Sequence, residues 1–242
     1  LAPFIKDMGK FDFVASKRSY DVNIKSGKFL LTQNMTSFDM IRAMRRNVPV
    51  KVAFNNQESL GKLAERMASQ LEPDSVALYV SFTNEPFLKE NGFTEENILA
   101  MFIPNTYEFY WDVNSNKLAD KMAKEYKKFW NHERLEKAAA KSLTPIEVSV
   151  LASIVHKETA KADERATVAG VYLNRLKTGI PLQADPTIIF AIKKETGDFD
   201  QVIKRVYHND LKIKSPYNTY VNPGLPPGPI AMPDISAIDA VL

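Results

Sequence analysis

The positions of apolar residues divide the chain into a short part with strand periodicity and a long part with helical periodicity. Val50, Val52 and Phe54 alternate with polar or small neighbours, which predicts a strand that ends at Phe54. The residues before this strand predict an earlier strand and, between the two strands, a helix. The expected order is strand, helix, strand over residues 27–31, 36–46 and 48–54. This order predicts a small β-α-β lobe near the N-terminus.

From about residue 55 onward, apolar residues recur at the spacing of amphipathic helices. A segment that contains Pro104 and several aromatic residues, 102–111, interrupts the pattern and is either a buried connector or the wall of a cleft. Helices are predicted over 57–71, 74–83, 94–102, 115–130 and 132–141. The predicted fold class is therefore α+β, with a mainly helical domain after the small lobe.

Local signals also mark three later helices. The sequence TPIE at 144–147 combines a capping Thr, a Pro for the first turn and a Glu for a capping box, so a helix should run to about Ala160. A second helix is expected over 163–179, where Gly179 ends it. The third should start at Asp185 and end near Gly197.

After these helices, the sequence changes to SPYNTYVNPGLPPGPIAMP, which starts at Ser215. Its prolines exclude regular structure over most of this segment. Tyr217, Tyr220 and Leu225 offer side chains that can pack against a core. The segment is therefore predicted to be a long ordered loop in preference to a flexible tail.

Glu158 is the residue that does not fit the helical pattern. At about 100° per residue, Leu151, Ile154, Val155 and Glu158 fall on one side of the helix. Desolvation disfavours the charged form of a carboxyl group, so the pattern predicts a protonated Glu158, as a general acid requires. The alternative is a purely structural Glu158 that is buried and paired with a cation such as Arg165 or Arg175.

Composition and motifs exclude most other chemistries. The 242 residues carry 32 basic and 29 acidic side chains, a net charge of +3 that does not indicate a nucleic-acid binder. The chain has no Cys, and its three His residues lack the spacing of a metal site. The sequence patterns of serine hydrolases and of nucleotide-binding loops are also missing, and no apolar run approaches the ~18 residues of a membrane span. We expect no metal and no organic cofactor.

Five motifs, in the same order as in a known family, carry a resemblance. They are FIPNTY at 102–107, ASIVHKET at 152–159, VYLNRL at 171–176, LQADPT at 182–187, and SPYNTY at 215–220 followed by GLPPGPI at 224–230. In these motifs the chain resembles the endolytic murein transglycosylases of the MltG (YceG-like) family. A fainter likeness extends back to about Gly27.

The resemblance implies Glu158 as the catalytic acid, the same residue that the helical pattern singles out. Two positions depart from the family pattern: His156 stands where the family usually has Glu, and Asn105 where many relatives have Asp. The resemblance also implies two domains, a LysM-like lobe over 1–54 and a YceG-like catalytic domain over 55–242. Because the chain opens without Met, we expect a piece of a longer protein that also lacks the family's last C-terminal stretch.

The implied substrate is the glycan strand of peptidoglycan. In the resembling family, the C6 hydroxyl of N-acetylmuramic acid attacks its own C1, and a 1,6-anhydro end forms without a second carboxylate. Residues expected to contact the glycan are Gln183, Asp185, Tyr217, Asn218, Thr219 and Tyr220. The resemblance further implies a single N-terminal membrane helix outside this chain, an extracytoplasmic (periplasmic) catalytic part on the bacterial inner membrane, and association with penicillin-binding synthases.

Two other functions remain open from the sequence. His156 favours a wall-binding scaffold with weak or no catalysis. A hydrolytic muramidase would need a second carboxylate, such as Asp185 or Glu108, to activate water.

Overall fold

Two segments far apart in the sequence form the sheet of this molecule, a computed structural model that describes residues 5–242. Strand β1 (Pro49–Phe54) pairs antiparallel with β2 (Asn105–Tyr110), and Val52 lies opposite Tyr107. The apolar positions of both strands face one core, where the rings of Phe54 and Tyr107 stack with centroids 5.3 Å apart. Apolar residues therefore alternate with exposed ones in β2 as they do in β1.

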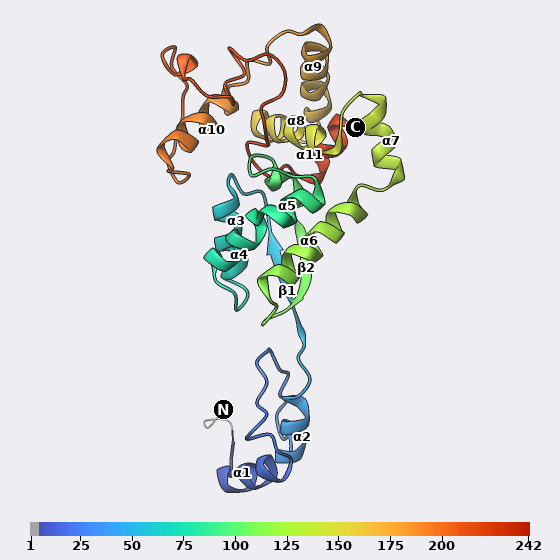
Figure 1. The fold of residues 1–242 in the computed structure, drawn as a ribbon, viewed down its shortest axis with the longest axis vertical. Coiled ribbons are helices and arrows are strands. Elements are labelled where there is room, and N and C mark those ends of the chain that lie inside the picture. The colour runs from blue at the N-terminus through green and yellow to red at the C-terminus, as the bar shows by residue number, and fades with distance from the viewer. Residues whose placement is uncertain (1–4) are drawn as a thin grey trace.

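Helices between and after the strands cover this core (Figure 1). Each helix supplies a stripe of buried apolar residues, such as Leu63 and Met67 on α3 or Leu118 and Met122 on α6. The elements are α3 (Leu60–Ala68), α4 (Ser75–Thr83), α5 (Glu85–Asn91), the 3-10 helix η2 (Ile98–Met101) and α6 (Ser115–Phe129). We call this part, residues 49–129, the middle part.

The remaining helices form a second core around α8 (Figure 1). Residues 148–155 of α8 are all buried, so this helix is the centre of the C-terminal part. Its neighbours α9, α10 and α11 pack directly against it. The elements are α7 (His132–Ala140), α8 (Pro145–Glu158), α9 (Arg165–Thr178), α10 (Asp185–Thr196), the 3-10 helix η3 (Asp210–Lys212) and α11 (Ile235–Val241).

The first residues form a separate lobe at one end of the elongated molecule (Figure 1). It contains α1 (Met8–Lys17) and α2 (Ser37–Ala43), which share a small core that includes Phe11 and Ile41. The predicted strand over 27–31 is wrong: this segment has no strand partner, and Leu30 is exposed. Because β1 pairs with β2, the predicted β-α-β lobe does not form within 1–54, of which residues 1–4 lie outside the description.

Most predicted helices are confirmed, with ends shifted by a few residues, whereas α1, α5, α11 and strand β2 were not predicted. The segment predicted as a helix over 94–102 forms only η2. The LysM-like character of the first lobe stays a prediction.

No single helix in the described part of the chain combines the length and the apolar composition needed to cross a membrane. Helices α7 and α8, which are joined by a bend, reach the length and the apolar composition of a membrane span only when the two are taken together.

Candidate active site

The start of α8 has the predicted capping box. The Thr144 hydroxyl accepts a hydrogen bond from the Glu147 backbone N–H at 3.2 Å, and the Glu147 carboxylate accepts one from the Thr144 N–H at 2.7 Å. This reciprocal pair satisfies two N–H groups that a helix start leaves without partners. At the other end the helix stops at Glu158, because Thr159 adopts an extended backbone. The candidate acid is therefore the last residue of a well-anchored buried helix.

The side chain of Glu158 is exposed, which corrects the predicted burial. Leu151, Ile154 and Val155 are fully buried as expected, but the apolar stripe ends one turn before Glu158 because the helix leaves the core there. The structural alternative is not supported either. Arg165 forms its ion pair with Asp234 at 3.2 Å, and Arg175 donates to backbone carbonyls.

Tyr172 on α9 is the partner of Glu158. Its hydroxyl donates a hydrogen bond to Oε2 of Glu158 at 3.3 Å. Burial raises the pKa of the Tyr172 phenol well above its usual value, and the negative charge of Glu158 raises it further. Tyr172 therefore remains a hydrogen-bond donor at any physiological pH and holds one oxygen of the carboxylate.

A second carboxylate and tyrosine lie beside this pair. Tyr220 donates to Oδ1 of Asp185 at 2.5 Å. Burial first, then the hydrogen bond and charge of Asp185 and the charge of Glu158, raise the pKa of Tyr220 to about 12. The charges of both carboxylates reach this phenol, so we treat Glu158 and Asp185 as one candidate site. Both side chains are exposed, so the site is open to solvent.

Arg175 shapes the turn that leads into α10. Its guanidinium donates to the Leu182 carbonyl at 2.5 Å and lies 3.5 Å from Oε1 of Gln183. Gln183 has a φ of +53°, in the left-handed region that non-glycine residues rarely adopt. Such backbone conformations concentrate at functional sites. The exposed amide of Gln183 is held at the edge of the same site as Asp185.

Tyr217, Asn218 and Thr219 are buried, with at most 1% of each side chain exposed. The Asn218 amide donates to the carbonyls of Leu211 and Ile213, both at 2.9 Å, and the Thr219 hydroxyl accepts from the Ala184 N–H at 3.1 Å. These bonds order the loop and fix the start of α10. Contact of these three residues with a substrate stays a prediction. The exposed side chains of the site are those of Glu158, Gln183 and Asp185, and Tyr220 is half-buried.

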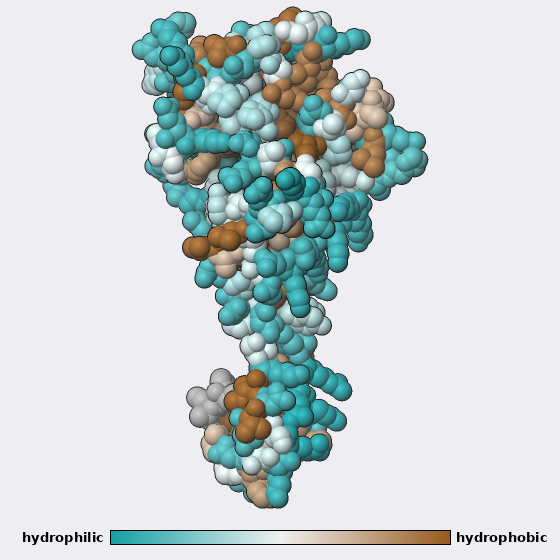
Figure 2. Space-filling model, viewed as in Figure 1, coloured by the Kyte–Doolittle hydropathy of each residue, from teal (hydrophilic) through white to brown (hydrophobic). Residues whose placement is uncertain are grey.

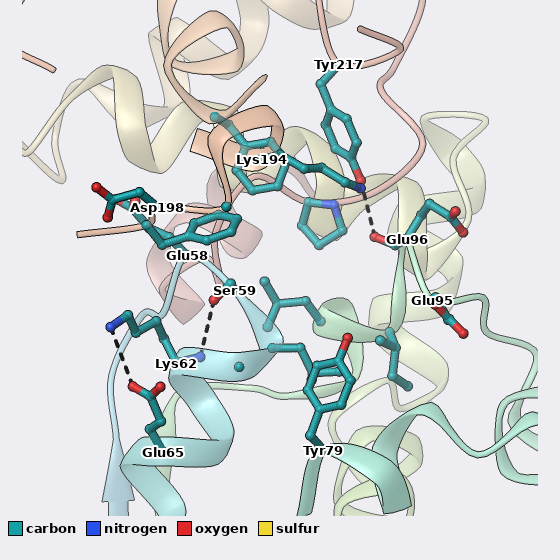
Figure 3. A pocket seen from close by; sticks show the side chains of 18 of the residues that line it. Glu58, Ser59, Lys62, Glu65, Tyr79, Glu95, Glu96, Lys194, Asp198 and Tyr217 are labelled. Atoms are coloured by element: carbon teal, nitrogen blue, oxygen red, sulfur yellow. Dashed lines mark hydrogen bonds and ion pairs between the residues drawn. The ribbon is translucent and has the colours of Figure 1, made fainter. Parts of the chain in front are cut away.

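Two adjoining pockets lie along α10. One, of about 390 Å³, is lined by Lys157 and Pro186, the sequence neighbours of Glu158 and Asp185. The other, of about 460 Å³, lies between α3, η2 and α10 and is shown in Figure 3. Four residues line both pockets, namely Glu58, Phe190, Phe199 and Asp200. The two pockets therefore form one hollow that runs along α10 to the middle part.

The sequence patterns do not point to Tyr172 or Glu58 as residues of this region. A Tyr on a helix that packs against a core carries a hydroxyl that needs a partner, and this is the signal that could have identified Tyr172. Glu58 has no sequence signal beyond being a lone acid in a loop. Of the two acids considered for a second role, Asp185 is in the site, whereas Glu108 lies on β2 opposite Lys51.

Comparison with known proteins assigns the family. The model of the YceG-like family matches residues 2–242. An endolytic murein transglycosylase from Bacillus subtilis is 32% identical over 194 residues, which cover 78% of this chain and 49% of that protein. One from Streptococcus pneumoniae serotype 2 is 27% identical over 95% of this chain and 46% of its own length.

The fold agrees with this assignment. The crystal structure of a YceG-like protein from Listeria monocytogenes superposes with a TM-score of 0.68 at 25% identity, and covers 98% of this chain and 82% of that one. The chain spans about half the length of the two transglycosylases that it matches. Since the family model extends over almost every residue, this chain belongs to the YceG-like family.

Proposed function

We propose that this protein is a peptidoglycan lytic transglycosylase in which Glu158 is the catalytic acid and base. The observation that carries the proposal is the exposed carboxylate of Glu158 at the end of a buried helix, held by Tyr172 and next to the Asp185–Tyr220 pair. The murein transglycosylases that the chain resembles supply the substrate class.

In the proposed reaction, the bond between C1 of N-acetylmuramic acid and the glycosidic oxygen of N-acetylglucosamine breaks. Glu158 donates its proton to that leaving oxygen. The C6 hydroxyl oxygen of the same muramic residue then bonds to C1 and gives its proton to the Glu158 carboxylate, which restores the acid. The ring closure is intramolecular, so correct positioning supplies much of the rate.

The neighbouring groups support this cycle. Tyr172 holds Oε2 of Glu158, so the other oxygen can face the sugar. In this proposal, Gln183, Asp185 and Tyr220 hydrogen-bond the sugar rings next to the cleaved bond, and the exposure of Gln183 and Asp185 supports this role.

The protein acts outside the cytoplasm on the wall side of the bacterial membrane, where peptidoglycan is found. A membrane helix in the segment before this chain anchors it, and penicillin-binding synthases that produce the glycan are its partners. These parts of the proposal rest on the family resemblance alone.

Replacement of Glu158 tests the proposal. Glu158→Gln keeps the shape and the hydrogen bond from Tyr172 but cannot give up a proton. Release of anhydro-muramyl products from purified sacculi should fall by about 10²-fold or more, as expected for loss of an acid–base group. Glu164→Gln is the matched control, because this exposed Glu lies six residues further on and its carboxylate bonds to Thr159 and Lys161 at the surface. Equal product release by wild type and Glu158→Gln would refute the assignment.

A hydrolytic muramidase is the second candidate, and the position of Asp185 favours it. Two carboxylates in one site allow one to act as acid and the other to activate water. In that case Asp185→Asn would abolish cleavage as completely as Glu158→Gln. In a transglycosylase, Asp185→Asn only weakens glycan binding, and anhydro ends still form.

A further inference from the structure

The loop between β1 and α3, residues 55–59, connects the middle part to the last turn of α8. Asn56 contacts Nε2 of His156 through its side-chain amide, and Glu58 binds the next residue, Lys157. The Gln57 carbonyl accepts a hydrogen bond from the Met232 N–H at 2.8 Å. The loop therefore contacts the two residues that directly precede Glu158.

Glu58 contacts two helices of the C-terminal part at once. Its Oε1 lies 2.5 Å from Nζ of Lys157 on α8, and its Oε2 lies 2.5 Å from Nζ of Lys193 on α10. Lys193 has only 11% of its side chain exposed, and Glu58 has 29%. Burial raises the pKa of Glu58, but hydrogen bonds and charge from both lysines outweigh it and leave the pKa below its usual value. The bridge is therefore ionised and partly shielded from water.

These two contacts fix the elements that carry the candidate site. Lys157 immediately precedes Glu158 at the end of α8. Lys193 lies on the helix whose first residue is Asp185. One carboxylate from the middle part thus links the helix end that carries Glu158 to the helix that carries Asp185.

Glu58 also lies in the hollow that the two adjoining pockets form. Glu58 lines both adjoining pockets, and Figure 3 shows it at the side of the larger one together with Asp198 and Lys194. The bridge therefore lies at the wall of this hollow, between the end of α8 and helix α10, where it can keep the spacing of the two helices constant.

We propose that Glu58 is a positioning residue for the reaction, which holds the last turn of α8 and helix α10 at the separation that glycan cleavage requires. This inference rests on the proposed function of Glu158. The body of α8 does not depend on the bridge, because residues 148–155 are buried in their own core. Loss of Glu58 should therefore loosen only the last turn and leave the fold intact.

The test compares Glu58→Gln with wild type on uncrosslinked glycan strands. Because a small misplacement of a catalytic group costs up to about 10²-fold in rate, kcat should fall by about 10-fold or more while KM changes by less than about 2-fold. Hydrogen exchange of the amides of residues 156–160 should become faster, with no change in residues 148–155. Glu65→Gln is the matched control, since Glu65 lines the same pocket in an exposed pair with Lys62 and should keep wild-type values.

Several outcomes would overturn the proposal. They are an unchanged kcat, a loss carried by KM instead of kcat, or unchanged exchange at residues 156–160. If Glu58→Gln does not fold, Lys193→Gln removes the bond from Glu58 to α10 and the weaker one to the Phe199 carbonyl but keeps the bond to Lys157, and it should show the same pattern with a smaller loss of kcat. If wild type itself forms no anhydro ends, the proposed function fails, whereas the exchange measurement still decides whether Glu58 holds the last turn of α8.

Discussion

At the scale of single residues, the helical pattern identifies Glu158 but misplaces it relative to solvent. Periodicity puts Glu158 on the side of Leu151 and Val155, and α8 has this geometry. Periodicity cannot show that the helix ends at Glu158, because the extended backbone of Thr159 depends on the neighbouring α9 and its loop. The Glu158 carboxyl is therefore exposed in the free protein, and the burial that the sequence predicts for it requires a bound substrate.

His156, which departs from the family pattern, lies in a cluster of charged groups. Its Nδ1 is 3.2 Å from the Asp234 carboxylate and 3.3 Å from Arg165, which is itself 5% exposed. Burial lowers the pKa of His156 below its usual value of 6.5, Asp234 acts against this shift, and Arg165 and Lys157 add to it. The folded protein thus prefers the neutral imidazole.

This preference predicts a pH effect on stability. A lowered pKa in the folded state means that the contribution of His156 is fully present above its ordinary pKa and is lost as the pH falls through the folded value. The free energy of unfolding in urea should therefore decrease between about pH 7 and about pH 5. His156→Gln cannot titrate and should show a smaller decrease. Identical pH profiles for the two proteins would show that His156 does not contribute.

At the scale of elements, local signals predict the helices that build the site well. The capping box at Thr144 and the glycines at the ends of α9 and α10 act as expected, with φ values of +69° for Gly179 and +71° for Gly197. Strand β2 could not be predicted in the same way. Its apolar alternation is short and follows Pro104, and its partner β1 lies about fifty residues earlier in the chain.

The segment that starts at Ser215 forms a packed loop, as predicted, and the side chain of Asn218 anchors its first part. Its side chain donates to the carbonyls of Leu211 and Ile213 and accepts from the Tyr220 N–H at 2.9 Å. The sequence cannot distinguish this structural use of an amide from contact with a sugar. The distinction depends on burial, which only the folded chain determines.

Asn218→Ala should destabilise the protein. The substitution leaves buried backbone groups without partners, which costs about 1–3 kcal/mol of unfolding free energy. The exposed Asn174 on α9 is the control, and Asn174→Ala should change stability by less than about 0.5 kcal/mol. Urea denaturation measures both variants. Equal stability of Asn218→Ala and wild type would contradict the structural role given to this amide.

At the scale of the whole molecule, the proline-rich C-terminal loop connects the two large parts. The Ile230 N–H donates to the Ser153 hydroxyl on α8 at 3.0 Å, and Tyr217 donates to the Glu96 carbonyl of the middle part at 3.5 Å. Long-range contacts such as these two hydrogen bonds have no local sequence signal.

The surface of the molecule carries both hydrophilic and hydrophobic side chains. Figure 2 shows hydrophobic side chains over the C-terminal helices and on the separate lobe.

Gly228 lies where the proline-rich loop passes close to the backbone of the middle part. A Cβ at this position would lie 1.8 Å from the Glu96 backbone oxygen, so Gly228→Ala forces the loop away. Overpacking of this kind costs about 1–3 kcal/mol, and the melting temperature should fall accordingly. Gly170 on α9 has open space around it, and Gly170→Ala should instead stabilise the helix by about 0.5–1 kcal/mol. A wild-type melting temperature for Gly228→Ala would show that the loop does not hold the parts together.

Lytic and hydrolytic cleavage differ in the source of the oxygen that replaces the broken glycosidic bond. Digestion of uncrosslinked glycan strands in water labelled with oxygen-18, followed by mass spectrometry of the new muramic ends, identifies that source. We predict anhydro ends that contain no label, because the C6 hydroxyl of the substrate attacks C1. Muramic ends that carry one labelled oxygen would show attack by water and would contradict attack by the C6 hydroxyl.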